Sequence, residues 1–222
     1  DDFKTKELEL ETKLKNFTNI NNSIHVKVGN ELSTVNQGKS LLVKATVAES
    51  FEKEFAIYDL NRFLSTHSLF NNKPEIILNS NHMILKDDNK TVKYVYCEPE
   101  FILTPPDKDL GISKTDYIFS ITAVDLQQVM KATAVMKFPN IEFRGSEGVL
   151  SVRAFDVENP TSDGFSITFG KSFKEFNAVF QTDLFKMLPD NYEIMIDKGI
   201  AQFSSSDMVY WMAVLRKESN FN

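Results

Sequence analysis

The order of predicted helices and strands repeats within this chain, and that internal repeat restricts the fold more than any other feature of the sequence. In the first half, short apolar or alternating runs separated by Asn, Gly and Asp turns predict strands, and helical patterns at 6–17 and 60–69 interrupt them. Helices predicted at 124–136 and 182–188 occupy the same places among the strands of the second half. We therefore interpret the chain as two copies of one α+β unit.

Short sequence matches support this repeat. Residues 75–78 (EIIL) and 193–196 (EIMI) each follow the second predicted helix of their half, and residues 56–58 (AIY) and 178–180 (AVF) each precede it. The offsets are 118 and 122 residues, a difference that loop lengths explain. Chance similarity between two β-rich halves is the alternative interpretation.

A proline-rich segment separates the two copies. Residues 98–113 contain three prolines and a closing glycine, which is typical of a linker. The sequence thus predicts a first domain at 1–97, a connector at 98–113 and a second domain at 114–222. Apolar residues at 101–103 lie within the connector. Because a solvated tether would more naturally be polar, we expect these residues to dock on a surface.

Composition restricts the classes of function. The formal net charge of −6 argues against a protein that coats DNA with a generally basic surface, but it is compatible with a local basic face. No segment approaches the roughly 18 consecutive apolar residues of a membrane span, so we expect no membrane partner. Cys97 is the only cysteine, which excludes an internal disulfide and a Cys-based zinc cluster and fits a reducing cytoplasm. We expect most of the 19 Phe to fill a β-rich core.

Each predicted helix carries a cation at a matched outward position. At about 100° per residue, Lys15 lies about 140° from Leu10, on the side away from the apolar stripe of its helix. Lys131 has the same angular position relative to Leu126 in the second half. The four matched cations are Lys15, Arg62, Lys131 and Lys186.

These four cations predict a DNA-facing surface. If the helices of both copies line one concave surface with the sheets behind them, an acidic protein acquires a basic lining suited to phosphate contacts. The helices lack a recognition face rich in Arg, Asn and Gln, so we expect the contact to be independent of base sequence. An ordinary solvated helix face is the alternative for each cation taken singly, and four in register favour the DNA-facing interpretation.

Three segments carry distinctive motifs: residues 13–21 (KLKNFTNIN), 55–64 (FAIYDLNRFL) and 124–130 (VDLQQVM). These segments and the spacing between them resemble the DNA sliding clamps of T-even-type bacteriophages. The resemblance covers nearly the whole chain, but outside the YDLN and DLQQ motifs it is diffuse, since clamps have no catalytic motif. Ala134 and Val135 depart from the pattern, because a pore helix could carry further cations there.

The resemblance implies a fold, an assembly and a set of partners. The fold is α+β, with two similar clamp-type domains in which antiparallel sheets back two helices. Subunits would assemble head to tail into a homotrimeric ring with twelve pore helices around duplex DNA. The implied function is that of a non-enzymatic processivity factor without cofactors, in the cytoplasm of the infected bacterial host. The implied partners are double-stranded DNA, a C-terminal peptide of the replicative polymerase, an ATP-driven clamp loader and late-transcription factors.

The resemblance also implies two kinds of contact surface. Ring closure in this family pairs edge strands of successive subunits, and the order of elements makes parts of 93–97 and 165–169 the candidates. These interface residues are Lys93, Tyr94, Val95, Phe165, Ile167 and Phe169. The connector and the C-terminal segment would border an apolar pocket for the polymerase peptide. Its candidate residues are Phe101, Ile102, Leu103, Val214 and Leu215. Packing of 101–103 between the domains is the alternative.

Two other classes of function are weighed against the clamp: an enzyme, and a structural or scaffold protein. An enzyme is disfavoured because no Ser or Cys has a motif context for nucleophilic attack and no Gly-rich phosphate loop is present. We therefore expect no catalytic residue and no metal ligand. The remaining alternative is a β-rich, two-domain structural or scaffold protein of a phage without a DNA-binding role, and the matched cations argue against it.

Overall fold

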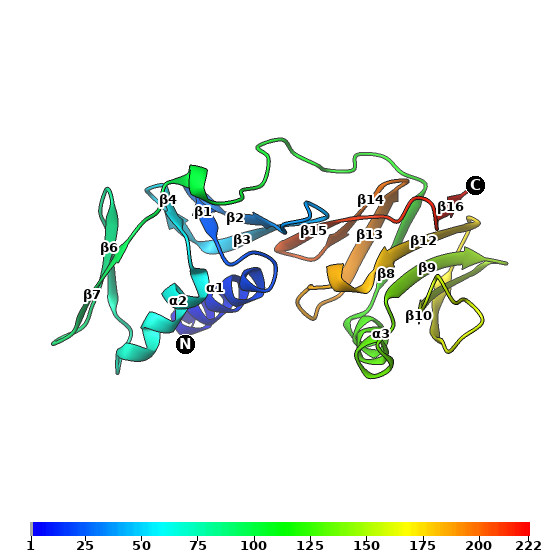
Figure 1. The fold of residues 1–222 in the computed structure, drawn as a ribbon, viewed down its shortest axis with the longest axis horizontal. Helices are drawn as coiled ribbons and strands as arrows, with labels where there is room; N and C mark the ends of the chain where they lie inside the picture. The colour runs from blue at the N-terminus through cyan, green and yellow to red at the C-terminus, as the bar shows by residue number, and fades with distance from the viewer. Residues whose placement is uncertain (1) are drawn as a thin grey trace. The chain divides into compact units, whose positions relative to one another are not determined.

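The structure is a computed structural model that describes the backbone of residues 2–222 and the side chains from residue 9 onward. The chain divides into two compact units, Asp1–Asp107 and Lys108–Asn222, which can be followed by colour in Figure 1. The division lies within 98–113, the segment interpreted as a connector from its prolines. The predicted limits of the two domains stay a prediction.

Unit 1 combines two α-helices with small groups of antiparallel strands. β1 pairs with β4, β2 pairs with β3, and β5, β6 and β7 form a three-stranded sheet. α1 packs on β3 and beside α2, so the two helices are neighbours (Figure 1). The elements are α1 (Asp2–Thr18), β1 (Ile24–Val26), β2 (Gly29–Val35), β3 (Leu41–Phe51), β4 (Phe55–Ile57), α2 (Leu60–Ser65), the 3₁₀ turn η1 (Thr66–Leu69), β5 (Glu75–Leu78), β6 (His82–Lys86), β7 (Thr91–Val95) and the 3₁₀ turn η2 (Pro99–Phe101).

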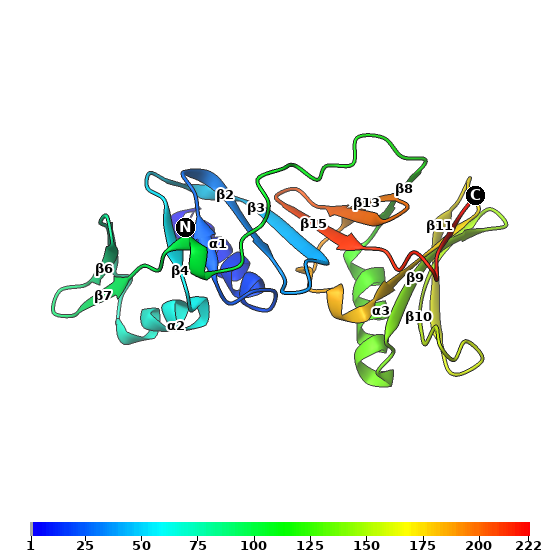
Figure 2. The same ribbon diagram turned by 45° about the horizontal axis from the view of Figure 1, so that its top comes forward.

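Unit 2 contains one α-helix and two antiparallel sheets. One sheet has the order β11-β10-β9-β12-β16, and the strands β15, β14, β13 and β8 pair in that order in the other. α3 packs on β10 and β11 and lies to the left of β9 and β10 in the view of Figure 2. The elements are β8 (Tyr117–Ile121), α3 (Ala123–Met136), β9 (Asn140–Ser146), β10 (Val149–Phe155), β11 (Phe165–Lys171), β12 (Phe176–Gln181), the 3₁₀ turn η3 (Thr182–Leu184), β13 (Tyr192–Asp197), β14 (Ile200–Ser204), β15 (Met208–Ala213) and β16 (Asn220–Phe221).

The two units share one topology, which confirms the predicted α+β fold of two similar domains. β1 pairs with β4 as β9 pairs with β12, and β2 pairs with β3 as β10 pairs with β11. The hairpins β5-β6-β7 and β13-β14-β15 also correspond. α1 and α3 occupy the same place in the element order. The similarity that the sequence matches indicated is therefore present in the strand pairing.

Helix periodicity explains how the helices attach to the sheets. Leu126, Val129 and Thr133 of α3 are buried, as their spacing predicts, and Phe17 of α1 is fully buried. α2 begins where predicted, because the Asp59 side chain accepts a hydrogen bond from the backbone N–H of Arg62 at 3.0 Å. The faces of α1 and α3 opposite these buried residues therefore point away from the strands on which the helices pack.

The predicted helix at 182–188 is wrong, and this removes one of the four helices expected per chain. Only a 3₁₀ turn forms at Thr182–Leu184, after which Phe185 has φ −79° and ψ 71°, outside the helical region. A pattern this short is poorly nucleated, and Pro189 disfavours helical geometry at the residue before it. Instead, the backbone of Leu188 is bonded to two buried side chains: its N–H donates to the Tyr210 hydroxyl, and its carbonyl accepts from Tyr192.

Strand β2 was not predicted, and neither was the short strand β16. The sequence patterns place strands at 24–28 and 40–47 and none between them, yet Gly29–Val35 pairs with β3. Gly, Asn, Glu, Ser and Thr make up most of this segment, so its apolar signal is weak. Its second half is nevertheless buried, with Leu32, Thr34 and Val35 each less than 5% exposed.

Aromatic side chains fill the core of unit 2. Phe143 is fully buried at its centre. The ring of Phe143 packs within 6.5 Å, between centroids, of Phe119, Phe169, Phe180, Phe185 and Phe203. This confirms that the many phenylalanines serve largely as core residues. Phe101 and Phe173 are exceptions, with 75% and 97% of their surface exposed.

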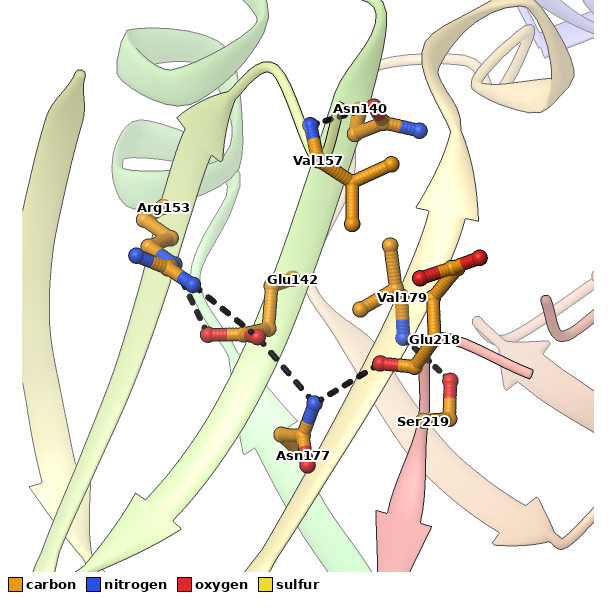
Figure 3. A network of polar contacts seen from close by, with 8 residues as sticks. All are labelled: Asn140, Glu142, Arg153, Val157, Asn177, Val179, Glu218 and Ser219. Carbon is orange, nitrogen blue, oxygen red and sulfur yellow. Dashed lines mark hydrogen bonds and ion pairs between the residues drawn. The ribbon is translucent and has the colours of Figure 1, made fainter. Parts of the chain in front are cut away.

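A polar network of Glu142, Arg153 and Asn177 fastens the C-terminal segment to β12 (Figure 3). The Glu142 side chain is only 4% exposed and accepts two hydrogen bonds from Arg153, from Nε at 2.8 Å and from Nη2 at 3.3 Å. Asn177 Nδ2 donates to Glu142 Oε2 at 3.2 Å and to the Glu218 carbonyl at 3.1 Å. The buried carboxylate thus orients an amide that holds the chain after β15.

Further bonds extend this attachment along β12. The Val179 N–H donates to Ser219 Oγ at 2.9 Å, and the Val179 carbonyl accepts from the Leu215 N–H at 2.8 Å. The Tyr117 hydroxyl donates to the Asn222 carbonyl at 2.9 Å. The segment from Leu215 onward is therefore an ordered part of unit 2.

We expect Arg153→Met to destabilise unit 2, because it leaves the Glu142 carboxylate buried without its cation. The loss should be roughly 2–3 kcal/mol, below the 3–5 kcal/mol typical of a fully buried pair, since the Arg153 side chain is 37% exposed. Urea unfolding followed by circular dichroism measures it. The double change with Glu142→Gln should recover most of the loss, and a single variant as stable as the unmodified chain would contradict the assignment.

Candidate functional site

Lys15 and Arg62 lie on the exposed faces of neighbouring helices in unit 1. The Lys15 side chain on α1 is 64% exposed, and its Nζ lies 2.7 Å from Oε1 of Glu11, one turn earlier. Arg62 on α2 is also exposed. Because α1 and α2 pack together, this unit presents both cations on adjacent helices.

The surroundings of Arg62 are electrostatically balanced. The Asp59 carboxylate accepts hydrogen bonds from the Arg62 N–H and from Asn22 Nδ2, which lower the pKa of Asp59 below its usual value. Asp59 thus stays ionised one turn away from the guanidinium. Lys15 and Arg62 therefore each have a carboxylate nearby, Glu11 on the same helix and Asp59 at the helix N-cap, which reduces the positive potential around them.

In unit 2, Lys131 lies on α3 and Lys186 lies in the coil after η3. Both are exposed. Lys186 was expected on a helix at the position that matches Arg62, and that expectation fails together with the helix itself. Its segment still packs beside α3, since Leu126, Met130, Phe185 and Met187 line one small hollow between them. The two cations of unit 2 are therefore carried by adjacent segments.

Several apolar side chains of α3 are exposed besides Lys131. Val124, Val135 and Met136 have 63%, 69% and 50% of their surface exposed. Lys131 is the one cation within Ala123–Met136. The departure noted at Ala134 and Val135 therefore lies on exposed surface, and α3 contributes a sparse positive charge.

The candidate interface segments are terminal strands of their sheets. β7 is at one end of β5-β6-β7, and β11 is at one end of β11-β10-β9-β12-β16. Lys93 and Val95 are exposed, whereas the Tyr94 hydroxyl donates to the Asp59 carbonyl at 3.1 Å. Phe165 is 37% exposed, and Ile167 and Phe169 are half-buried. Their role between subunits stays a prediction.

The candidate partner-binding residues differ in accessibility. Phe101 is 75% exposed, and Ile102 and Leu103 are half-buried. Val214 is buried at 6% and Leu215 is half-buried, so Leu215 is the more accessible of the C-terminal pair. The first three belong to unit 1 and the last two to unit 2. A common pocket for them stays a prediction.

The described residues hold no group of three or more His, Cys, Asp and Glu side chains arranged to bind a metal ion. Cys97 is a free, half-buried thiol whose pKa is raised by burial, the opposite of an activated nucleophile. Across the described part of the chain, the helices are too short or too polar to cross a membrane.

Comparison with known proteins relates this chain to clamps by sequence. Residues 118–215 match the family described as the gp45 sliding clamp, C terminal. The chain is 28% identical over 208 residues to the sliding clamp of Vibrio phage KVP40, covering 90% of this chain and 94% of that protein. It is 28% identical over 211 residues to the sliding clamp of Enterobacteria phage T4, covering 90% and 92%.

Solved structures share the fold at low sequence identity. A PCNA from A. fulgidus, bound to the C-terminal region of FEN-1, superposes with a TM-score of 0.69 at 14% identity, covering 94% of this chain and 95% of that one. The Helicobacter pylori beta clamp, bound to a DNA ligase peptide, gives a TM-score of 0.67 at 13% identity, covering 93% of this chain and 64% of that one. The resemblance that the sequence motifs indicated is confirmed: this chain is similar over 90% of its length to the sliding clamps of Vibrio phage KVP40 and Enterobacteria phage T4, and residues 118–215 match the family model of the clamp's C-terminal part.

Proposed function

We propose that this chain is one subunit of a DNA polymerase sliding clamp, a non-enzymatic ring that encircles duplex DNA in the infected host cell. The observation that carries the proposal is the placement of exposed cations in both units: Lys15 with Arg62, and Lys131 with Lys186, on adjacent segments. They give each unit of an acidic chain a pair of exposed cations, and Lys15 and Lys131 lie on helices that occupy the same place in the repeated fold. The similarity to phage sliding clamps supports the same function.

The proposed DNA contact is electrostatic and mobile. A clamp that moves along DNA needs attraction to the phosphates without deep energy minima, because a strong directional bond would hold the clamp at one position. Lysine side chains on exposed helix faces meet that need. The ion pair between Lys15 and Glu11 reduces the attraction further.

We expect the combined variant K15A, R62A, K131A and K186A to load onto DNA about tenfold less at physiological salt, because it removes phosphate-neutralising charge. Clamp loading and the length of polymerase products measure the effect, and light scattering checks that the assembly is unchanged. The matched control removes four exposed lysines outside this surface: K53A, K108A, K114A and K217A. Equal losses in both variants, or none in either, would contradict a DNA-facing role.

We propose that the ring is a homotrimer closed by head-to-tail pairing of β7 with β11 of the next subunit. Both strands end a sheet of their own unit, so each offers main-chain hydrogen-bonding groups to another strand. Successive residues of an antiparallel edge strand direct their N–H groups to opposite sides. Of the two neighbouring residues Ser166 and Ile167 in β11, one therefore directs its N–H toward β10 and the other directs its N–H toward the free edge of the sheet.

We expect one of the two variants Ser166→Pro and Ile167→Pro to fold normally and to lose the trimer. Proline removes one N–H, and the variant whose lost N–H faces outward spares the β10 ladder. Light scattering gives the mass, and the melting temperature identifies which variant folds. Alanine at the same positions keeps both N–H groups and should remain trimeric. If the folded proline variant is trimeric, β11 is not the interface.

We propose that the connector residue Phe101 receives the C-terminal peptide of the replicative polymerase, together with Ile102, Leu103, Leu215 and the edge of Val214. Phe101 supports this because an aromatic ring 75% exposed on an ordered 3₁₀ turn is a ready apolar contact. Packing of the segment 101–103 between domains remains the competing explanation.

We expect Phe101→Ser to weaken binding of a fluorescent polymerase-tail peptide by about tenfold or more, from the loss of one buried aromatic contact. Fluorescence anisotropy measures the affinity, and sizing checks the ring. Tyr58→Ser is the control, because Tyr58 is 65% exposed elsewhere on unit 1. Unchanged affinity with a destabilised fold would favour the interdomain explanation.

The same surface would serve the remaining partners. An ATP-driven clamp loader must open the ring and release it on DNA, and late-transcription factors would use the loaded clamp as a mobile platform. Excess polymerase-tail peptide should compete with both if they share the pocket. A chain that stays monomeric at micromolar concentration would instead support a scaffold protein without a DNA-binding role.

A further inference from the structure

The first half of the connector is bound to unit 1. After β7, the Cys97 N–H donates to the Ala56 carbonyl at 3.0 Å, and η2 follows at Pro99–Phe101. Asn21 Nδ2 then donates to the Leu103 carbonyl at 3.0 Å. On the other side, the Ile112 N–H donates to Gln202 Oε1 of unit 2 at 3.2 Å. The apolar part of the connector therefore moves with unit 1.

The Asn21 side chain uses both of its N–H donors and its oxygen in this attachment. It is 7% exposed, and Nδ2 donates both to the Val35 carbonyl at the end of β2, at 3.2 Å, and to the Leu103 carbonyl. Its Oδ1 accepts from the Ser23 N–H at 3.0 Å. A carboxamide supplies two donors and an acceptor at one point, which a carboxylate or a hydroxyl of similar size cannot do.

A second attachment of the connector is solvent-exposed. Lys27 Nζ donates to Asp107, and this bond and its charge lower the pKa of the Asp107 carboxyl. The two side chains are 56% and 87% exposed. Pairs of this kind contribute little to stability because water screens them. The buried bond from Asn21 is therefore the one expected to fix the connector backbone.

Fixing Leu103 also fixes the presentation of Phe101. Leu103 is half-buried and Phe101 is exposed two residues earlier, with the intervening N–H of Ile102 bonded to the Pro99 carbonyl at 3.2 Å. The turn and the Asn21 bond together restrict the backbone on both sides of Ile102. An apolar anchor held in this way loses less conformational entropy when a peptide binds.

We propose that Asn21 is a positioning residue for the partner peptide: its buried carboxamide ties the Leu103 carbonyl to β2 and so sets the connector wall of the peptide site. This inference rests on the proposed function, because it places the polymerase peptide at Phe101. Asn21 itself is too buried to touch the peptide. Its role is to hold the backbone that does.

The test compares Asn21→Asp with two controls in the full-length chain. Aspartate keeps the acceptor for Ser23 but sets a second carbonyl-like oxygen against Val35 and Leu103. We expect amide hydrogen exchange across 98–107 to accelerate about tenfold, and the affinity for a fluorescent polymerase-tail peptide to fall about tenfold, as for one lost buried hydrogen bond. Lys27→Met should change both quantities less than twofold.

A second control separates positioning from a general loss of stability. Val47 is 5% exposed in β3 and lies beyond the Glu31–Thr46 pair, at the opposite end of the β2–β3 ladder from Val35. Val47→Ala should lower the melting temperature without changing exchange at 98–107 or peptide affinity. If Val47→Ala reproduces the effects of Asn21→Asp, or if Asn21→Asp leaves connector exchange at its original rate, Asn21 is not a positioning residue. An unmodified chain that binds no peptide would instead refute the proposed partner site.

Discussion

Burial of one face of each helix against a sheet is the constraint on which the other features of this molecule depend. Phe17 of α1 is buried, as are Leu126, Val129 and Thr133 of α3. The opposite faces of these two helices are therefore exposed to solvent. That geometry sets where Lys15 and Lys131 lie before any ligand is considered. Repetition of the same topology in both units then places these charges twice in one chain.

Local patterns explain why so much of the fold could be predicted from the sequence. The helix α3 spans almost four turns and begins at a capping Thr122, so its periodicity is unambiguous. The pattern after Thr182 is short and ends at Pro189, and the backbone of Leu188 is instead bonded to Tyr192 and to Tyr210, the latter 22 residues away in sequence. Strand β2 was missed for a related reason: its pairing with β3, rather than its own composition, keeps it extended.

The same distinction between local patterns and contacts made only on folding separates the site residues that could be predicted from those that could not. Outward cations could be found because an angle on a helix depends only on spacing. The network of Glu142, Arg153 and Asn177 and the bond from Asn21 to Leu103 could not, since each joins segments brought together only by folding. A weak signal existed for the first: Glu142 and Arg144 alternate with buried apolar residues in β9, which marks a polar sheet face.

The pairing of Lys15 with Glu11 has a consequence for how such a ring would respond to salt. An ammonium group that already has a carboxylate partner has fewer condensed ions to displace from DNA than a bare one. The logarithmic dependence of affinity on salt concentration would then have a slope smaller than a count of lysines suggests. If the cations of the ring were paired with carboxylates in this way, the electrostatic energy would vary little as the ring moves along DNA. The affinity for DNA would also change little over a wide range of ionic strength.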